Sequence, residues 1–195
     1  MEKLTQRKIQ ALQTKTKIFT CAVNLFAEDT YEKITIQDIC KAADVSVGAF
    51  YHHFSSKADI LDVGYHLFDE QIRSEQEELA AMDSIEAIRV LIIKSIHAMN
   101  GLGMKGTLQY FKNQLTNGER YILNQERYFY KILHQNVENA IASGILAGEA
   151  NLITDELLSM SRGMIYDWCL HEGTYSLEER VLKLTDMILN YYRKY

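Results

Sequence analysis

The sequence predicts an all-α protein, and three observations support this fold class. Proline, which breaks helices when it lies inside them, is absent from all 195 residues. Apolar residues recur at intervals of three and four along most of the chain, as they do on the buried face of a helix. No segment stands out for the alternation of apolar and polar residues that is typical of a strand.

Nine helices are expected, three in an N-terminal unit over residues 1–56 and six in the remainder, residues 57–195. No linker rich in Gly, Pro or Ser separates the two parts, so the helix that begins at Lys57 is expected to join them. The expected helices cover residues 7–28, 35–43, 46–54, 57–81, 84–99, 104–115, 120–143, 154–171 and 176–193.

The two short helices of the N-terminal unit have clear signals at their ends. Thr35 and Asp38 have the spacing of a capping box, and Ser46 is placed to cap the following helix. Phe50 and Phe54 lie four residues apart and therefore share one face of that helix, which predicts that both are core anchors. Two short helices joined by a tight turn can present the second helix to the major groove of duplex DNA.

Charge is distributed unevenly along the chain. The formal net charge is −5, yet residues 1–57 carry eight Lys or Arg against six Asp or Glu, and the remainder carries thirteen against twenty. The positive charge is therefore concentrated in the part that is predicted to bind DNA.

An ordered pattern of residues extends through the N-terminal unit. It comprises Phe26, Ile34-Thr35-Ile36, Ile39-Cys40-Lys41-Ala42-Ala43, and Val45-Ser46-x-Gly48-x-Phe50-Tyr51-x-His53-Phe54, followed by Lys57 and Leu61. In this pattern residues 9–57 resemble the DNA-binding domain of the TetR family of bacterial transcriptional regulators. The resemblance implies a nine-helix TetR-like fold, with an N-terminal helix-turn-helix domain and a C-terminal domain that binds a ligand and dimerises.

The start of the helix after Ser46 is built from small residues. Val47, Gly48 and Ala49 would let the backbone approach a groove closely, and the two methyl-bearing side chains could contact thymine methyl groups. Gly48 costs about 1 kcal/mol of helix stability relative to alanine, which close approach to DNA would explain and plain packing could also explain. Polar contacts with bases are expected from Gln37 and from Ser46 or His52. The resemblance places Gln37, Val47, Gly48, Ala49 and His52 at the DNA interface.

Phosphate contacts are expected from Tyr51, His53 and Lys57. The hydroxyl of Tyr51 can point outward because its neighbour Phe50 faces the core, and Lys57 combines a cation with the free backbone N–H groups of a helix start. The resemblance assigns phosphate contact to the same three positions. No metal site is expected, because adjacent histidines project to different faces of a helix and no third ligand is visible.

Large, soft side chains characterise the second part of the chain. Methionine and aromatic residues can line a pocket for a ligand, or they can simply fill the core of a helix bundle. The resemblance favours a pocket between the helices. The expected lining residues are Tyr65, Phe68, His97, Tyr110, Phe111, Met164 and Trp168.

The last two expected helices each carry an apolar face. Such a face could be covered within one subunit, but the resemblance implies that the two helices pair with those of a second subunit. The expected dimer-interface residues are Leu157, Ser161, Ile165, Val181, Leu184, Ile188 and Tyr191.

These observations predict a homodimeric repressor that binds a near-palindromic operator in double-stranded DNA and is released by a small apolar or amphipathic effector. The alternative is a DNA-binding regulator that senses no small molecule and is controlled by a protein partner. An enzyme is not expected, because no nucleophile–base pair, phosphate loop or metal spacing is visible, and neither is a cofactor. No apolar run approaches the roughly 20 residues of a membrane span, and the N-terminus has no apolar signal core, so a cytoplasmic protein without a membrane partner is expected.

Overall fold

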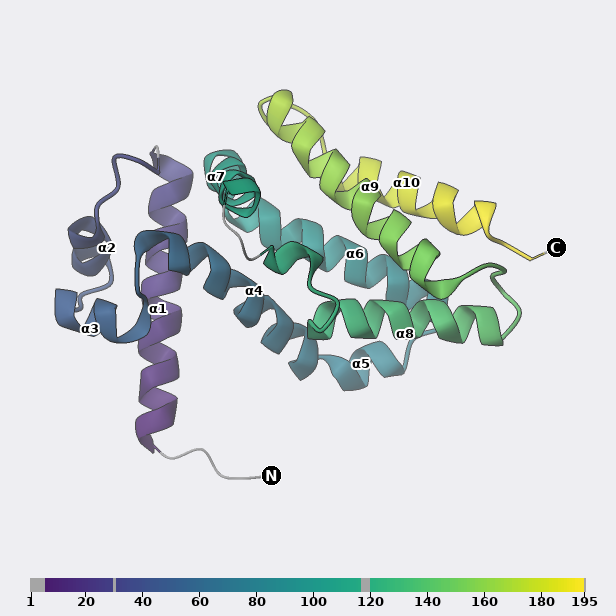
Figure 1. Cartoon of the computed structure of the whole chain (residues 1–195), viewed down its shortest axis with the longest axis horizontal. Coiled ribbons are helices and arrows are strands. Elements are labelled where there is room, and N and C mark those ends of the chain that lie inside the picture. Colours follow the sequence, from purple (N-terminus) through teal and green to yellow (C-terminus); the bar gives the residue numbers. More distant parts are fainter. Residues whose placement is uncertain (1–5, 30, 117–119, 195) are drawn as a thin grey trace.

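The computed structural model describes residues 6–29, 31–116 and 120–194. These residues form ten α-helices and one 3-10 helix, arranged as an elongated molecule (Figure 1). In chain order the helices are α1 (Gln6–Glu28), α2 (Ile36–Ala42), α3 (Val47–His53), α4 (Lys57–Ser74), α5 (Gln76–Ala80), α6 (Ser84–Gly101), α7 (Gly103–Thr116), the 3-10 helix η1 (Tyr121–Leu123), α8 (Tyr128–Ala142), α9 (Ala150–Leu170) and α10 (Leu177–Tyr191).

Helices α1, α2 and α3 form a small unit at one end of the molecule (Figure 1). The predicted capping box of α2 is present: the Asp38 N–H donates to Thr35 Oγ1 over 3.1 Å, and the Thr35 N–H donates to Asp38 Oδ2 over 2.8 Å. Ser46 caps α3 by accepting the Ala49 N–H over 3.1 Å. Phe50 and Phe54 are both buried, as the sequence predicts.

Helices α6, α8, α9 and α10 form the larger bundle at the opposite end (Figure 1). Each contributes buried apolar residues at helical spacing, such as Ile88 and Leu91 on α6 or Leu133 and Val137 on α8. Burial of these side chains supplies the main stabilisation of the bundle.

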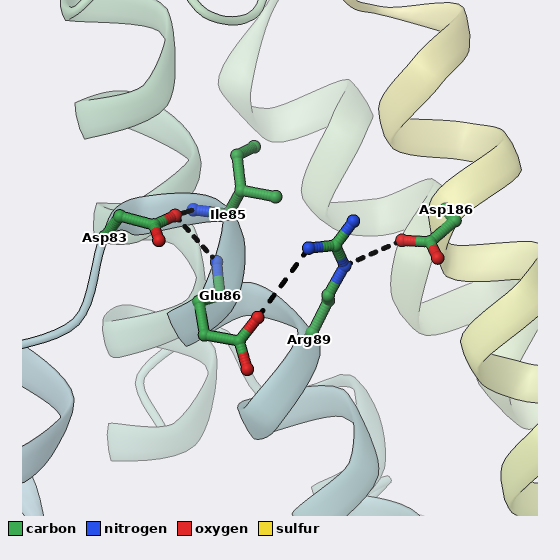
Figure 2. A network of polar contacts seen from close by, with 5 residues as sticks. All are labelled: Asp83, Ile85, Glu86, Arg89 and Asp186. Carbon is green, nitrogen blue, oxygen red and sulfur yellow. Dashed lines mark hydrogen bonds and ion pairs between the residues drawn. The ribbon is translucent and has the colours of Figure 1, made fainter.

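An ionic network ties α6 to α10 within this bundle (Figure 2). Asp83 caps α6 by accepting the N–H groups of Ile85 and Glu86, both over 3.0 Å. One turn further on, the Arg89 guanidinium lies 3.6 Å from the Glu86 carboxylate and 2.7 Å from the carboxylate of Asp186. Its pairing with Asp186 raises the pKa of Arg89.

Helix α4 belongs to both parts of the molecule. Its residues Ile60 and Leu61 pack in the N-terminal core together with Leu102 and Tyr110, whereas Ile72 packs in the core of the bundle. The two cores therefore do not divide at residue 57, and the domain boundary placed there stays a prediction. A rigid helix that reaches both cores can transmit a displacement from one to the other.

Two of the expected helices differ from the observed ones, and the break of the first into α4 and α5 raises the number of α-helices among the described residues from the expected nine to ten. The expected helix 57–81 ends at Ser74, where Glu75 leaves helical geometry and its carboxylate pairs with Lys94 of α6 at 2.9 Å. The expected helix 120–143 begins only at Tyr128, because Arg127 is extended and pairs with Asp69 of α4. In both places an ion pair between segments distant in the sequence coincides with the break.

Candidate functional site

One face of α3 is buried and the opposite face is open to solvent. Phe50 and Phe54 lie in the core beneath the helix, while Val47 is 42% exposed and Tyr51 is 56% exposed. Of the other predicted base-contact residues, Gln37, Ser46, Gly48 and His52 are exposed, and Ala49 is half-buried. The predicted DNA contacts on α2 and α3 are thus at least partly open to solvent.

The turn between α2 and α3 has a defined geometry. Asp44 adopts a left-handed conformation with φ of 49°, which aspartate tolerates better than most residues. The Val45 N–H then donates to Cys40 O over 3.0 Å, and the Ser46 cap begins α3 directly afterwards. These contacts hold α3 at a fixed angle to α2.

Gly48 has no packing partner that requires a glycine. A Cβ placed at this residue would meet only Ser46 Oγ, at 3.8 Å, and the surface around it is otherwise open. The packing explanation for Gly48 is therefore not supported by its surroundings. A glycine here removes side-chain bulk from the exposed face of α3 and nowhere else.

Lys57 makes contacts that the sequence did not indicate. Its ammonium donates to the backbone carbonyl of Tyr31 and, over 2.7 Å, to that of Ile34, and it lies 4.0 Å from the centre of the Tyr31 ring. Burial lowers the pKa of Lys57. An ammonium has three N–H donors, of which these carbonyls use two. Lys57 therefore ties α4 to the loop before α2, whether or not it also contacts a phosphate.

The start of α4 presents a capped helix end beside α3. Ser56 Oγ accepts the Asp59 N–H over 3.1 Å, and the Asp59 carboxylate accepts the Ser55 N–H over 2.7 Å. His53 lies nearby at the end of α3, where burial and then the charges of His52 and Lys15 lower its pKa. Lys15 of α1 and His52 of α3 therefore place positive charge beside His53, while α4 adds the carboxylate of Asp59 at Ser55.

A cavity of about 390 Å³ lies between α1, α4, α6, α7, α8 and α9. Its walls are mainly apolar, and among the described residues that line it there is no aspartate, glutamate, lysine or histidine. Four of the seven predicted pocket residues line it, namely Tyr65, Phe68, Tyr110 and Phe111. Such a volume and lining are typical of a small-molecule site.

The other three predicted pocket residues do not line this cavity. His97 is exposed and pairs with Glu178 of α10 at 2.8 Å. Trp168 donates from Nε1 to the Tyr175 carbonyl over 3.1 Å, which closes the turn between α9 and α10. Met164 is half-buried against the core of the bundle. All three lie on faces of their helices that the apolar pattern could not distinguish from the cavity face.

Two arginines line the cavity and were not predicted. Arg127 forms a two-pronged ion pair with Asp69, at 2.8 and 3.2 Å, and its guanidinium lies 4.2 Å from the centre of the Tyr65 ring. Arg162 projects from α9, half-buried, between the apolar positions Leu158 and Ile165 that also line the cavity. An arginine amid apolar neighbours is the signal in the sequence that could have identified it.

The predicted dimer residues fall into two groups. Leu157, Ser161, Ile165 and Val181 are buried in the core of their own chain, and Ser161 and Ile165 also line the cavity, so these four side chains do not lie on its surface. Leu184 and Ile188 are half-buried, and Tyr191 is 81% exposed. These three line a shallow surface groove with Glu156, Met160 and Met187. Both helices have apolar residues on two sides: on α9 the sequence pattern selected the inner side, and on α10 it selected the outer side apart from Val181.

Other kinds of site find no support in the described part of the chain. Among its residues no group of three or more His, Cys, Asp or Glu is placed to hold a metal ion. None of its helices is long and apolar enough to cross a membrane.

Comparison with known proteins identifies the N-terminal unit as similar to the DNA-binding part of the tetR family. Residues 18–63 match the family model of bacterial regulatory proteins of the tetR family. The chain is 31% identical over 88 residues to the HTH-type transcriptional repressor KstR2 of Rhodococcus jostii, a match covering 44% of this chain and 43% of that protein. It is 24% identical over 196 residues to the probable acrEF/envCD operon repressor of Escherichia coli, covering 93% of this chain and 88% of that protein.

Solved structures extend the likeness of fold to nearly the whole chain. A TetR transcription regulator from Haloarcula marismortui superimposes with a TM-score of 0.73 at 17% identity, covering 94% of this chain and 100% of that chain. The transcriptional regulator FadR from Bacillus subtilis, in complex with stearoyl-CoA, gives a TM-score of 0.61 at 19% identity, with 90% and 95% covered.

Proposed function

The chain belongs to the TetR family of bacterial transcriptional regulators, and from this premise we propose that it is a homodimeric repressor released from its operator by a small molecule. Two α3 helices related by two-fold symmetry would enter successive major grooves of a near-palindromic site. Regulation of transcription at an operator, rather than catalysis, is the proposed activity, and it would take place in the cytoplasm.

The observation that carries this proposal is the open face of α3. The face is built from small and polar side chains over a buried aromatic anchor, and a Cβ added to Gly48 in its centre would have only Ser46 Oγ within 4 Å. Val47 and Ala49 would approach thymine methyl groups, and Gln37, Ser46 and His52 would supply polar base contacts. Tyr51, His53 and the third N–H donor of Lys57 would hold phosphates.

Dimerisation is proposed through the exposed side of α9 and α10. The groove there is apolar apart from Glu156, and Met187 is 58% exposed. Apolar side chains gathered in this way on the surface are typical of an interaction site. Met187→Asp is therefore expected to give monomers in analytical ultracentrifugation, while Leu123→Asp, at an equally exposed leucine on η1, leaves the dimer intact. A Met187→Asp protein that sediments as the wild type does would remove this surface from the proposal.

Release from the operator is proposed to begin in the cavity. Helices α1 and α4 both line it and both pack in the N-terminal core, so a ligand there would displace the elements that carry α3. A hundredfold loss of operator affinity requires a coupling of about 2.7 kcal/mol, which is within the range of allosteric effects. The similar fold of FadR with stearoyl-CoA bound supports a ligand in a protein of this architecture.

Footprinting of the DNA upstream of the gene for this chain tests the proposal. Tyr51→Ala and Lys57→Ala are expected to weaken binding roughly tenfold each, as the loss of a hydrogen bond to a charged group does. Lys131→Ala on α8, which removes an exposed lysine far from α3, is the control. Because Lys57 also ties a loop, urea unfolding of each variant must show that the fold is retained. If both variants protect the operator as well as Lys131→Ala does, the DNA-binding surface has been assigned wrongly.

A further inference from the structure

The charge of the cavity lining is the feature that the proposed function leaves unexplained. No acidic residue is found among the described residues that line the cavity, although Asp and Glu outnumber Lys and Arg by 26 to 21 in the chain. The two charged side chains in the lining, Arg127 and Arg162, are both cations. The charged residues among the described lining of this apolar cavity are therefore all cations, although the protein as a whole is acidic.

The two arginines differ in their partners. Arg127 is neutralised by Asp69, and both side chains of this pair are buried. Arg162 donates from Nη2 to the neutral Ser159 hydroxyl over 3.0 Å, and in the described part of the chain no carboxylate lies within 4.0 Å of its guanidinium. Arg89, which is paired with Asp186, shows the opposite arrangement (Figure 2). Burial lowers the pKa of Arg162, whereas pairing raises that of Arg89.

Two tyrosine hydroxyls in the same lining are also unsatisfied. The hydroxyls of Tyr65 and Tyr110 are buried and have no hydrogen-bond partner among the described residues, and the two rings lie 4.9 Å apart. The Arg127 guanidinium lies 4.2 Å from the centre of the Tyr65 ring, and Arg162 lines the same cavity. A buried hydroxyl without a partner is unfavourable, so a ligand that accepts a hydrogen bond from it would be stabilised.

We propose that the cavity binds an amphipathic anion, whose headgroup is held by Arg162 and the Tyr65 hydroxyl and whose apolar body lies against the aromatic and aliphatic walls. The guanidinium would donate to the anionic oxygens, and the Tyr65 O–H would donate to the same headgroup. Phe68, Phe111, Leu61 and Ile165 would contact the apolar body. A cationic amphiphile is disfavoured by this arrangement, because it would bring a further positive charge into a cavity whose lining holds two arginines and no carboxylate among the described residues. That binding of the anion regulates transcription rests on the proposed function, whereas the binding itself does not.

The test compares four ligands that share one twelve-carbon chain and differ in the headgroup. Dodecanoate, dodecyl phosphate, dodecanol and dodecyltrimethylammonium are titrated below their micelle concentrations into the full chain, and binding is followed by calorimetry. The two anions are expected to bind more tightly than dodecanol, and the cation to bind most weakly. Whichever of dodecanoate and dodecyl phosphate binds more tightly identifies the natural headgroup as a carboxylate or a phosphate.

Two variants separate the headgroup contact from general effects on the cavity. Arg162→Gln is expected to weaken both anions about ten- to hundredfold, as loss of a charge-assisted hydrogen bond does, and to leave dodecanol unchanged. Arg193→Gln, at an exposed arginine outside the cavity, is expected to leave all four affinities unchanged. Unfolding by urea verifies that both variants are folded.

Three results would overturn the proposal: tighter binding of the cation than of the anions, equal weakening of anions and dodecanol by Arg162→Gln, or no binding of any of the four. Failure of the proposed function is read separately, by a gel-shift assay with the upstream DNA. A chain that binds the anions through Arg162 but does not bind or release this DNA would retain the ligand site and lose the repressor. A chain that binds the DNA but none of the anions would retain the proposed repressor function and lose the proposed ligand site.

Discussion

The proposed DNA-binding surface and the cavity are built in opposite ways. The surface on α2 and α3 comes from about twenty consecutive residues, held by caps within the same segment, and the exposed residues at the start of α3 are small. The cavity is assembled from six helices that span most of the chain, and its lining side chains are large. A surface of local origin can be read from sequence because its contacts are short-range. A cavity lined by residues far apart in the sequence depends on how whole helices pack, so the structure is needed to show which residues line it.

The largest expected change in the free energy of unfolding tests whether one face of α3 anchors the helix while the other is free to bind. Phe50→Ala removes a buried ring and is expected to lower the free energy of unfolding by about 3 to 5 kcal/mol. Tyr51→Ala, one residue away on the exposed face, is expected to cost about 1 kcal/mol at most, because its ring only touches the edge of Phe50. Urea unfolding measures both. Similar losses in the two variants would contradict the division of the helix into an anchor face and a binding face.

The second effect tests whether distant contacts hold the cavity together. Asp69→Asn breaks the buried pair between α4 and α8 and is expected to lower the free energy of unfolding by about 3 kcal/mol, because the Arg127 charge stays buried without its partner. Glu126→Gln, which breaks the exposed pair with Lys131, is the matched control and should unfold as the wild type does. An equal loss of the free energy of unfolding in Glu126→Gln and Asp69→Asn would show that the buried pair has no special role in holding the cavity together.

Gly48→Ala is expected to change stability and binding in opposite directions. Alanine favours the helix by about 0.8 to 1 kcal/mol over glycine, and the space around the new methyl group is open. The free protein should therefore become more stable in urea, while the operator, which would meet the added methyl group, should bind less tightly in a gel-shift assay. A variant with unchanged operator affinity would show that α3 does not approach DNA closely at this residue.

The smallest effect is a pH dependence centred on His53. Burial and the charges of His52 and Lys15 lower its pKa in the folded protein, so the unfolded chain binds the proton more readily. Stability contributed by neutral His53 is therefore complete above the unfolded pKa of about 6.5 and is lost as the pH falls through and below it. The difference in urea midpoint between wild type and His53→Gln should shrink from pH 7.5 to pH 5.5.

Operator binding should respond to pH in the opposite sense. A phosphate beside His53 would favour the protonated imidazole, so operator affinity is expected to rise as the pH falls toward 6, and to do so less in His53→Gln. Gel shifts at constant ionic strength measure this, since salt alone changes such affinities. An equal pH response in both proteins would place His53 away from the phosphates.

The sequence-based predictions were more accurate for features that depend on neighbouring residues than for features that depend on contacts between distant helices. The caps at Thr35 and Ser46 and the anchors Phe50 and Phe54 were predicted correctly, since each depends on residues within four positions. The helix breaks at Glu75 and Arg127 were missed, since each coincides with an ion pair to a helix elsewhere in the chain. The contacts of Lys57 with the carbonyls of Tyr31 and Ile34 were missed for the same reason.

The sequence by itself determined the all-α fold, the helix-turn-helix and the outward face of α3, because helical periodicity and capping act over one or two turns. Only the tertiary structure decided which side of α9 and α10 is buried, since both sides are apolar and the choice depends on what packs against them. It alone added Arg162 to the cavity that Tyr65 and Tyr110 line, because residues so far apart meet only once whole helices have packed.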